Sequence, residues 1–278
     1  MTEFQVGGHR GATQLIPKEN ILYKPDNEIE SSFYEHATQT LLKEYIPEYY
    51  GKEELDLGYG KINYFKMENT ISQMKRPCVL DLKMGTRTWN EEYPEKKILH
   101  KKAIDEKSTT PMYGFRFCGM KVSVDNHLKN MQYTKACFDF ENTFDNVKLF
   151  INEFLNPLIV LEENGNEGKN IVCSNAEKII GQMKLNFENE KKNELKNKMI
   201  EKLIQKLMKF KDVYDECGYQ LISSSLFFFY DKENPLDTID FKMIDFAHWK
   251  DKKHRSEISD GFSIGTQSII TLLSQLIK

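Results

Sequence analysis

The stretch Arg76-Pro-Cys-Val-Leu-Asp-Leu-Lys-Met-Gly-Thr-Arg-Thr-Trp89 is the part of the chain from which the fold can be worked out. Its residues alternate as in an extended strand. The apolar face, which predicts a core, consists of Cys78, Leu80, Leu82 and Met84. The other face carries Asp81, Lys83 and then Gly85, which lets the backbone turn or come close to a ligand. This face is a candidate site, although spacing alone leaves a solvated surface strand equally open.

Composition is that of an ordinary globular protein. The 278 residues suit one large domain or two closely packed lobes, and 40% of them are hydrophobic. A net charge of −3 excludes a globally basic nucleic-acid binder, so a polyanionic ligand needs a local basic patch. Five cysteines without a Cys-x-x-Cys pair indicate free thiols in a reducing compartment. With neither a signal-peptide pattern nor a membrane-length apolar run, we expect a soluble, monomeric protein of the cytoplasm or nucleus.

The N-terminal part has the layout of a nucleotide-phosphate site. Glycines in residues 4–11 suggest a tight hairpin, and Lys24 stands near the end of the extended segment 21–25. Kinases cover ATP phosphates with a glycine loop and then place a strand lysine on them. A hairpin followed by a solvated lysine accounts for the same residues. A helical segment over 29–45, between two prolines, comes next and contains Glu35.

Periodicity and turn residues divide the rest of the chain. A strand over 62–67 ends at Glu68, where we expect a small N-lobe (1–68) to meet a larger C-lobe (69–278). The further elements expected are a β-prone segment over 113–122, helices over 144–158 and 188–217, a polar loop at 165–168, a hairpin over 223–245 and a C-terminal helix ending near Ile277.

A charged segment, Pro94–Ala103, follows the first strand described above. Lys97 and Lys101 are four residues apart, so on a helix they share one face. Such a run is often only a solvated face. An anion-binding wall that follows the Lys83–Arg87 segment is the alternative.

Several segments, in chain order, resemble the inositol polyphosphate kinase family. The family's Pro-x-x-x-Asp-x-Lys-x-Gly signature is reproduced by Pro77, Asp81, Lys83 and Gly85. The residues around it look like the inositol hexakisphosphate kinase version. Other segments similar to the family are Gly7-Gly-His9, Leu22-Tyr-Lys-Pro25, Phe33-Tyr-Glu35, Ser224-Ser-Leu226 and Ile244-Asp-Phe-Ala-His248. The segment Asp260–Gly265 departs from the family because it lacks a spacer before its glycine.

This resemblance implies a two-lobed α+β fold, distantly similar to protein kinases. The N-lobe has an antiparallel sheet and one main helix, and the C-lobe is larger and mixed. The resemblance also implies ATP and Mg²⁺ as cofactors. The implied reaction is transfer of the γ-phosphoryl group of ATP to inositol hexakisphosphate, which gives a diphosphoinositol polyphosphate, with less phosphorylated inositols as further acceptors.

On the nucleotide side, the resemblance implies specific contacts. Lys24 neutralises the ATP phosphates, and Glu35 on the helix holds Lys24 in place. The backbone at Glu68 reads the adenine edge. Asp81 has two open roles, because it could bind the ribose or act as a base toward the acceptor. A phosphate acceptor barely needs a base, since it is already deprotonated near neutral pH.

Asp245 is the residue expected to bind the metal. It ends an apolar strand, where an unpaired buried carboxylate is costly, and Mg²⁺ is its natural partner. An aspartate that caps a turn is the simpler alternative. With Asp81 and with Lys83, which contacts the transferring or accepting phosphate, Asp245 completes the expected catalytic set. The residues expected to bind the inositol phosphate are Lys83, Lys97, Lys101, Lys102 and Arg116.

Two alternatives stand beside this reading. An inositol trisphosphate kinase or multikinase is one, because residues 86–92 are similar to the trisphosphate kinase sequence. Only 28 residues separate Gly85 from Gly114, which leaves no room for the long helical insertion of the trisphosphate-specific enzymes. A catalytically inactive inositol-phosphate binding module is the other, and a binder has no need of a magnesium ligand such as Asp245.

Overall fold

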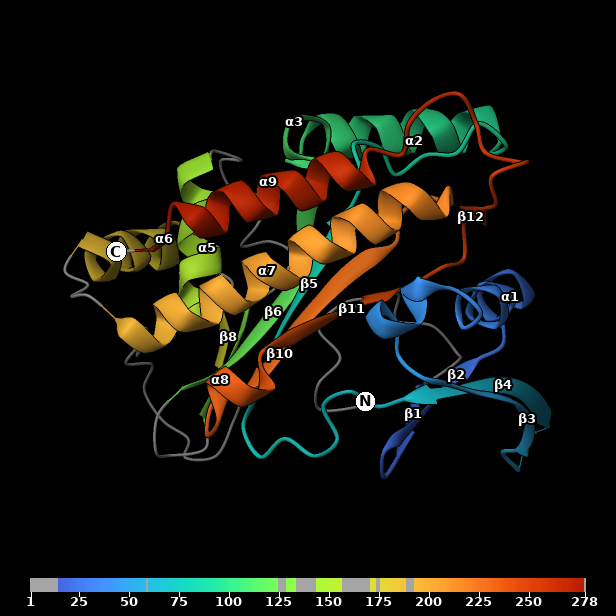
Figure 1. The fold of residues 1–278 in the computed structure, drawn as a ribbon, viewed down its shortest axis with the longest axis horizontal. Coiled ribbons are helices and arrows are strands. Elements are labelled where there is room, and N and C mark those ends of the chain that lie inside the picture. The colour runs from blue at the N-terminus through green and yellow to red at the C-terminus, as the bar shows by residue number, and fades with distance from the viewer. Residues whose placement is uncertain are drawn as a thin grey trace.

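Two β-sheets carry the fold in the computed structural model, which describes residues 15–58, 60–124, 129–133, 144–156, 171–173, 176–188 and 193–277. The expected glycine hairpin at 4–11 and polar loop at 165–168 lie outside these residues. The smaller sheet is antiparallel, in the order β1 (Ile16–Lys18), β2 (Ile21–Pro25), β4 (Lys61–Glu68), β3 (Tyr49–Asp56). It packs with the helix α1 (Glu28–Ala37) and the 3₁₀ helix η1 (Leu41–Tyr45), and together these elements form the smaller lobe (Figure 1).

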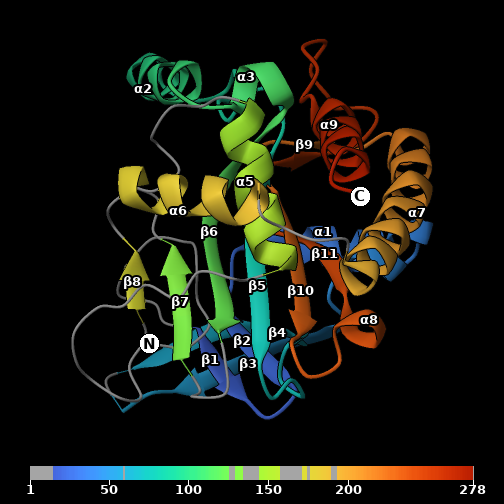
Figure 2. The same cartoon turned by 90° about the vertical axis from the view of Figure 1, so that its left-hand side faces the viewer.

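The larger sheet is organised around β5, which Figure 2 shows near its middle. Its strand order is β11 (Asp240–Ile244), β10 (Ser225–Asp231), β5 (Pro77–Met84), β6 (Phe115–Val124), β7 (Lys129–Tyr133) and β8 (Ile171–Cys173). Neighbouring strands are antiparallel except β7 and β8, which are parallel. The predicted core face of β5 is confirmed, because its four apolar residues belong to the main core cluster.

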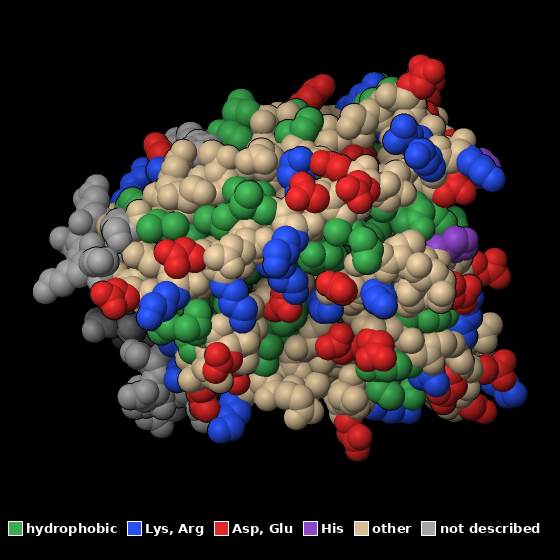
Figure 3. Space-filling view, in the orientation of Figure 1, with side chains coloured by type: hydrophobic (Ala, Val, Ile, Leu, Met, Phe, Trp, Pro, Cys, Tyr) green, Lys and Arg blue, Asp and Glu red, His purple; other side chains and the backbone are tan. Residues whose placement is uncertain are grey.

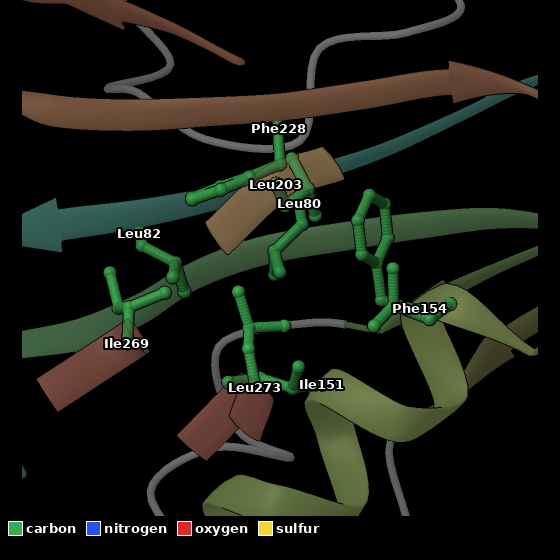
Figure 4. A pocket seen from close by; sticks show the side chains of 9 residues that line it. Leu80, Leu82, Ile151, Phe154, Leu203, Phe228, Ile269 and Leu273 are labelled. Carbon is green, nitrogen blue, oxygen red and sulfur yellow. The ribbon is translucent and has the colours of Figure 1, made fainter. Parts of the chain in front are cut away.

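Three helices cover this core face of the large sheet. They are α5 (Phe144–Leu155), α7 (Glu194–Cys217) and α9 (Phe262–Ser274). Side chains from all three meet Leu80 and Leu82 of β5 around a small cavity (Figure 4). All nine side chains that line this cavity are apolar, so it belongs to the core and offers no polar group to a substrate.

The remaining helices and strands complete the described part of the chain. They are α2 (Glu95–Glu106), α3 (Thr110–Tyr113), α6 (Ala176–Glu188), α8 (Pro235–Thr238) and the paired strands β9 (Gln220–Leu221) and β12 (Trp249–Lys250). The predicted hairpin over 223–245 is confirmed as β10 and β11, with α8 in its turn. Among the described helices, none has both the length and the apolar character that crossing a bilayer requires.

Two predicted helices have different bounds in the structure. The segment 29–45 is not one helix, because α1 ends at Ala37 and η1 begins at Leu41 after its N-cap, Thr40. The long charged helix begins at Glu194 rather than near 188. The side chain of Asn193 caps it by accepting a hydrogen bond from the Lys196 amide at 3.0 Å.

The two lobes share one continuous apolar core. The ring of Phe33 on α1 stacks on Phe246, which follows β11, with a centroid distance of 4.0 Å. The indole nitrogen of Trp249 donates a hydrogen bond to the carbonyl of Ile29 at 2.7 Å. These contacts fix α1 against the end of the β10–β11 hairpin, which is where the polar residues described next come together.

Glycines allow α9 to begin directly against the ends of β5 and β6. Gly85 has φ +104°, and a Cβ there would lie 2.6 Å from the carbonyl oxygen of Asp260. A Cβ on Gly265 would lie 2.0 Å from the carbonyl oxygen of Gly114. The close approach that Gly85 permits is therefore an approach of one backbone segment to another.

Candidate active site

Lys24, Glu30 and Asp245 form an ion-pair group at the junction of the lobes. The Lys24 ammonium lies 2.8 Å from a Glu30 oxygen and 2.6 Å from an Asp245 oxygen. Glu30 is 3% exposed and also accepts a hydrogen bond from the Phe246 amide. Burial lowers the pKa of Lys24, but the charges of Asp245 and then Glu30 outweigh it and raise that pKa above its ordinary value. Lys24 is therefore a fixed, fully charged cation.

The expected pairing of Lys24 with Glu35 is wrong. Glu35 is exposed and accepts a hydrogen bond from the Tyr49 hydroxyl at 3.2 Å. Glu30 lies on the buried face of α1 with Phe33 and Tyr34, three and four residues on, whereas Glu35 lies on the opposite face. Helical periodicity in the sequence would have identified Glu30.

Asp245 and Ser223 adopt a left-handed backbone at the same end of the β10–β11 hairpin. Their φ angles are +65° and +62°, which are unusual for residues other than glycine. Ser225 pairs with Ile244, so the residues just outside this pair lie side by side. Such backbone strain persists only where the surroundings enforce it, and it clusters at functional sites. Although burial opposes it, the charges of Lys24 and Lys83 lower the pKa of Asp245.

Asp81 and Lys83 lie on the face of β5 opposite the core, as predicted. Asp81 is 6% exposed, and its Oδ1 accepts no hydrogen bond from a described residue. Burial and then the charge of Asp245 raise the pKa of Asp81 to about 6. The Lys83 ammonium donates a hydrogen bond to the Ser223 carbonyl at 3.0 Å. The strained backbone of Ser223 thus aims an oxygen at Lys83.

The helix α2 brings further cations toward Lys83. Burial lowers the pKa of Lys101, and the charges of Lys83 and Arg116 lower it further. Burial also lowers the pKa of His248, with added effects from Lys97 and Lys101. Lys101 therefore lies within the electrostatic influence of Lys83, Arg116 and Lys97, and His248 within that of Lys97, Lys101 and Lys83. We call Lys83, Lys97, Lys101 and Arg116, together with the imidazole of His248, which its lowered pKa keeps neutral near pH 7, the cation cluster.

Tyr93, just before α2, links two members of this cluster. The Lys97 ammonium lies 3.5 Å from the centre of the Tyr93 ring, and the edge of that ring meets His248 at a centroid distance of 5.2 Å. Neither Tyr93 nor His248 was predicted from the sequence as a site residue. The His248 signal was present, because this histidine closes the segment Ile244–His248.

Arg116 and Lys102 are placed differently from the other expected cations. Arg116 is 8% exposed and ion-paired with Asp105 at 2.8 Å. The Lys102 ammonium lies 4.4 Å from the centre of the Trp89 ring. On the helix it is rotated by about 140° from Lys97. The structure therefore does not bring Lys102 into the cation cluster.

The expected adenine contact at Glu68 meets a backbone already engaged in the sheet. The amide of Glu68 donates a hydrogen bond to Glu48, and the amide of Asn69 donates one to Asn20, both at 2.8 Å. These two donors are consequently committed within the smaller lobe. A nucleotide base would find the carbonyl oxygens there rather than these amides.

The face of the molecule shown in Figure 3 carries mixed charge. In the described part of the face shown in Figure 3, Lys and Arg side chains are interleaved with Asp and Glu. This agrees with a net charge of −3. Attraction for a polyanion must then come from the local cation cluster.

A two-lobed α+β architecture with a lysine held by two carboxylates at the lobe junction places this protein in the general class of kinase-like folds. An inositol phosphate multikinase from S. cerevisiae, in complex with ADP and Mn²⁺, has a similar structure, with a TM-score of 0.65 over 92% of this chain and 98% of that chain at 20% identity. This likeness shows the fold.

Sequence comparison then gives the family. The inositol polyphosphate kinase family model matches residues 64–274, and the chain belongs to this family. An inositol polyphosphate multikinase from Schizosaccharomyces pombe is 26% identical over 296 residues, covering 99% of this chain and 97% of the relative.

Two other relatives align over less of their length. Inositol polyphosphate multikinase beta from Arabidopsis thaliana is 33% identical over 140 residues, 43% of this chain and 45% of the relative. Human inositol hexakisphosphate kinase 3 is 24% identical over 243 residues, 77% of this chain and 51% of the relative. The alignments thus span about half the length of these two proteins.

Proposed function

We propose that this protein transfers the γ-phosphoryl group of ATP to a phosphorylated inositol. The observation that carries the proposal is the meeting of the Lys24–Glu30–Asp245 group with Asp81 and Lys83, beside the cation cluster. Phosphoryl transfer asks a protein mainly for positioning and charge neutralisation. A partly buried cation for one substrate and several cations for the other meet that demand.

The residues present fit a magnesium ion held together with ATP. Asp245 has a partly exposed carboxylate, and Asp81 close by has an oxygen without a partner among the described residues. Mg²⁺ is commonly bound by one or two carboxylates together with substrate phosphates. The bound ion neutralises charge that develops on the phosphate oxygens. We assign Asp245 to it, with Lys24 on the ATP phosphates.

The other roles follow from position. Glu30 holds Lys24, and Lys83 contacts the transferring or accepting phosphate. Asp81 keeps two roles, as a base that orients the acceptor oxygen or as a ligand of the ribose. A variant at Asp81 separates them, because loss of a base lowers kcat whereas loss of a ribose contact raises KM for ATP. We further propose the boundary of the lobes at residue 68.

For the acceptor we propose inositol hexakisphosphate, because four cationic side chains gather at the cation cluster beside the imidazole of His248. A multikinase that acts on less phosphorylated inositols is the second candidate. The match over nearly the full length of the S. pombe multikinase favours it. Incubation with ATP, Mg²⁺ and a panel of inositol phosphates, followed by chromatography of the products, tests both candidates. If no member of the panel is phosphorylated, the protein is an inactive binding module instead.

Replacing Glu30 with Gln is expected to weaken ATP use by about 10- to 150-fold in kcat/KM, because a hydrogen bond to a charged group contributes roughly 1.5–3 kcal/mol. Glu35→Gln is the matched control on the same helix. It should leave the ATP kinetics unchanged, since Glu35 contacts Tyr49 and not Lys24. Steady-state kinetics with varied ATP, with melting temperatures for both variants, provide the measurement. An equal defect in both variants would show that Glu30 does not act through Lys24.

Replacing Lys97 or Lys101 with Ala is expected to raise KM for the hexakisphosphate several-fold, roughly 3- to 10-fold, and to leave kcat largely unchanged. These lysines would hold phosphates that do not react. Lys102→Ala should have a smaller effect, because Lys102 is rotated by about 140° around α2 from Lys97 and lies outside the cation cluster. Added salt should reduce the differences in KM between the lysine variants and wild type, since salt screens exposed charges. Acceptor titrations at low and high ionic strength check this, and wild-type KM in both variants would place the acceptor elsewhere.

A further inference from the structure

The helix α2 depends on one buried side chain. Of its residues Glu95–Glu106 only Asp105 is buried, with 3% exposure. Its carboxylate accepts hydrogen bonds from the amide and the hydroxyl of Thr88, both at 2.7 Å, and from Arg116 at 2.8 Å. One carboxylate thus joins α2 to the segment that follows β5 and to β6.

The groups fixed by Asp105 all border the cation cluster. Arg116 is the cross-strand neighbour of Lys83 in the β5–β6 pair. Lys101 lies one turn before Asp105 on α2. Its pKa responds to the charges of Lys83 and Arg116. Asp105 therefore ties α2, which carries Lys101, to Arg116, whose cross-strand neighbour is Lys83.

A second observation points to an anion at this place. The Nε of Arg116 is buried and has no hydrogen-bond partner among the described residues, whereas its Nη1 is bound to Asp105. A buried donor without a partner is costly. A guanidinium held at one end, with a donor left over beside Lys83 and Lys101, suits a phosphate oxygen.

We propose that Asp105 is a positioning residue for the acceptor, which orients Arg116 and Lys101 so that they contact the same phosphorylated ring as Lys83. This proposal rests on the proposed function and adds to it the residue that organises the acceptor side. Asp105 itself, as an anion, does not contact the phosphates.

A role in charge balance alone predicts the opposite sign. If Asp105 only offset positive charge, removing its charge would raise the positive potential of the cation cluster and lower KM for a polyanion. If it positions the cations, the same change raises KM. Asp105→Asn separates the two roles, since the amide oxygen can still accept from Thr88 but the ion pair with Arg116 is lost. Asp105→Glu keeps the charge and moves it by one methylene.

The test compares wild type with Asp105→Asn, Asp105→Glu and a control, Thr88→Val. The control removes the Thr88 hydroxyl bond but keeps the Arg116 pair. KM and kcat are measured for inositol hexakisphosphate and for ATP, and folding is followed by melting temperature. We expect Asp105→Asn and Asp105→Glu each to raise KM for the inositol phosphate by about tenfold, with kcat and KM for ATP within about twofold of wild type. Thr88→Val should lower the melting temperature without changing KM.

The outcomes are distinguishable. A lowered or unchanged KM in both Asp105 variants overturns the positioning role, and so does a Thr88→Val variant that raises KM as much as they do. If Asp105→Asn does not fold, the KM of Asp105→Glu for the inositol phosphate decides between the two roles, because the glutamate keeps an anionic partner for Arg116. A wild-type protein that phosphorylates no inositol phosphate defeats the proposed function itself. In that case, direct binding of inositol hexakisphosphate by calorimetry tests Asp105, with the same tenfold weakening expected.

Discussion

Replacing Asp245 with Asn is expected to lower kcat by at least about 100-fold while leaving the binding of an inositol phosphate nearly unchanged. The substitution removes the negative charge assigned to Mg²⁺ and the 2.6 Å ion pair with Lys24. Asparagine tolerates the left-handed backbone that this position requires, at φ +65°, so the local fold should survive. The loss of kcat in this variant would then come from the missing negative charge and not from a change in backbone strain.

The measurement is steady-state turnover in saturating Mg²⁺, together with calorimetric titration of the inositol phosphate. Asp215→Asn is the control, since Asp215 lies on α7 in an exposed pair with Lys211. It should behave as wild type. Activity of Asp245→Asn within about threefold of wild type would reject the assignment of Asp245 to the metal.

Replacing Gly265 with Ala should produce a large loss of stability. The new Cβ would lie 2.0 Å from the carbonyl oxygen of Gly114 and 2.9 Å from the side chain of Met84. The first contact is with backbone, so α9 must move away from β5 and β6. We expect a loss of about 3 kcal/mol or more, or roughly 6–12 °C in melting temperature.

Gly181→Ala is the matched control, because Gly181 also lies in a helix but a Cβ there meets nothing within 4 Å. It should stabilise the protein by about 0.5–1 kcal/mol, since alanine is the better helix former. Thermal unfolding of both variants gives the comparison. Similar melting temperatures for the two would mean that α9 does not approach the sheet as closely as the structure has it.

The chain's local patterns determined much of the fold. Strict alternation in Arg76–Trp89 was enough to predict β5 and its core face, because a strand places alternate residues on opposite sides. The turn residues between 231 and 237 predicted the β10–β11 hairpin. Family motifs placed Lys24, Asp81 and Asp245 in one site, and the structure brings these three together at the lobe junction.

Tertiary structure decided which neighbours these residues have. The sequence offered three carboxylates on α1, and only the packing of its apolar face on Phe246 makes Glu30, not Glu35, the partner of Lys24. Lys102 seemed equivalent to Lys101, yet the rotation of α2 places it on Trp89.

Contacts between residues far apart in the sequence determine the surroundings of Asp105 and Gly85, and no local sequence pattern predicts these contacts. Asp105 reads as one more charge in a solvated run, but it is buried because Thr88 and Arg116, from two other elements, converge on it. Gly85 looked like a glycine for ligand approach, and the atom that approaches it belongs to Asp260, far along the chain. Spacing along the chain fixes which residues share a face. Which groups meet across faces depends on how separate elements pack, and that packing follows from the burial of apolar surface over the whole molecule.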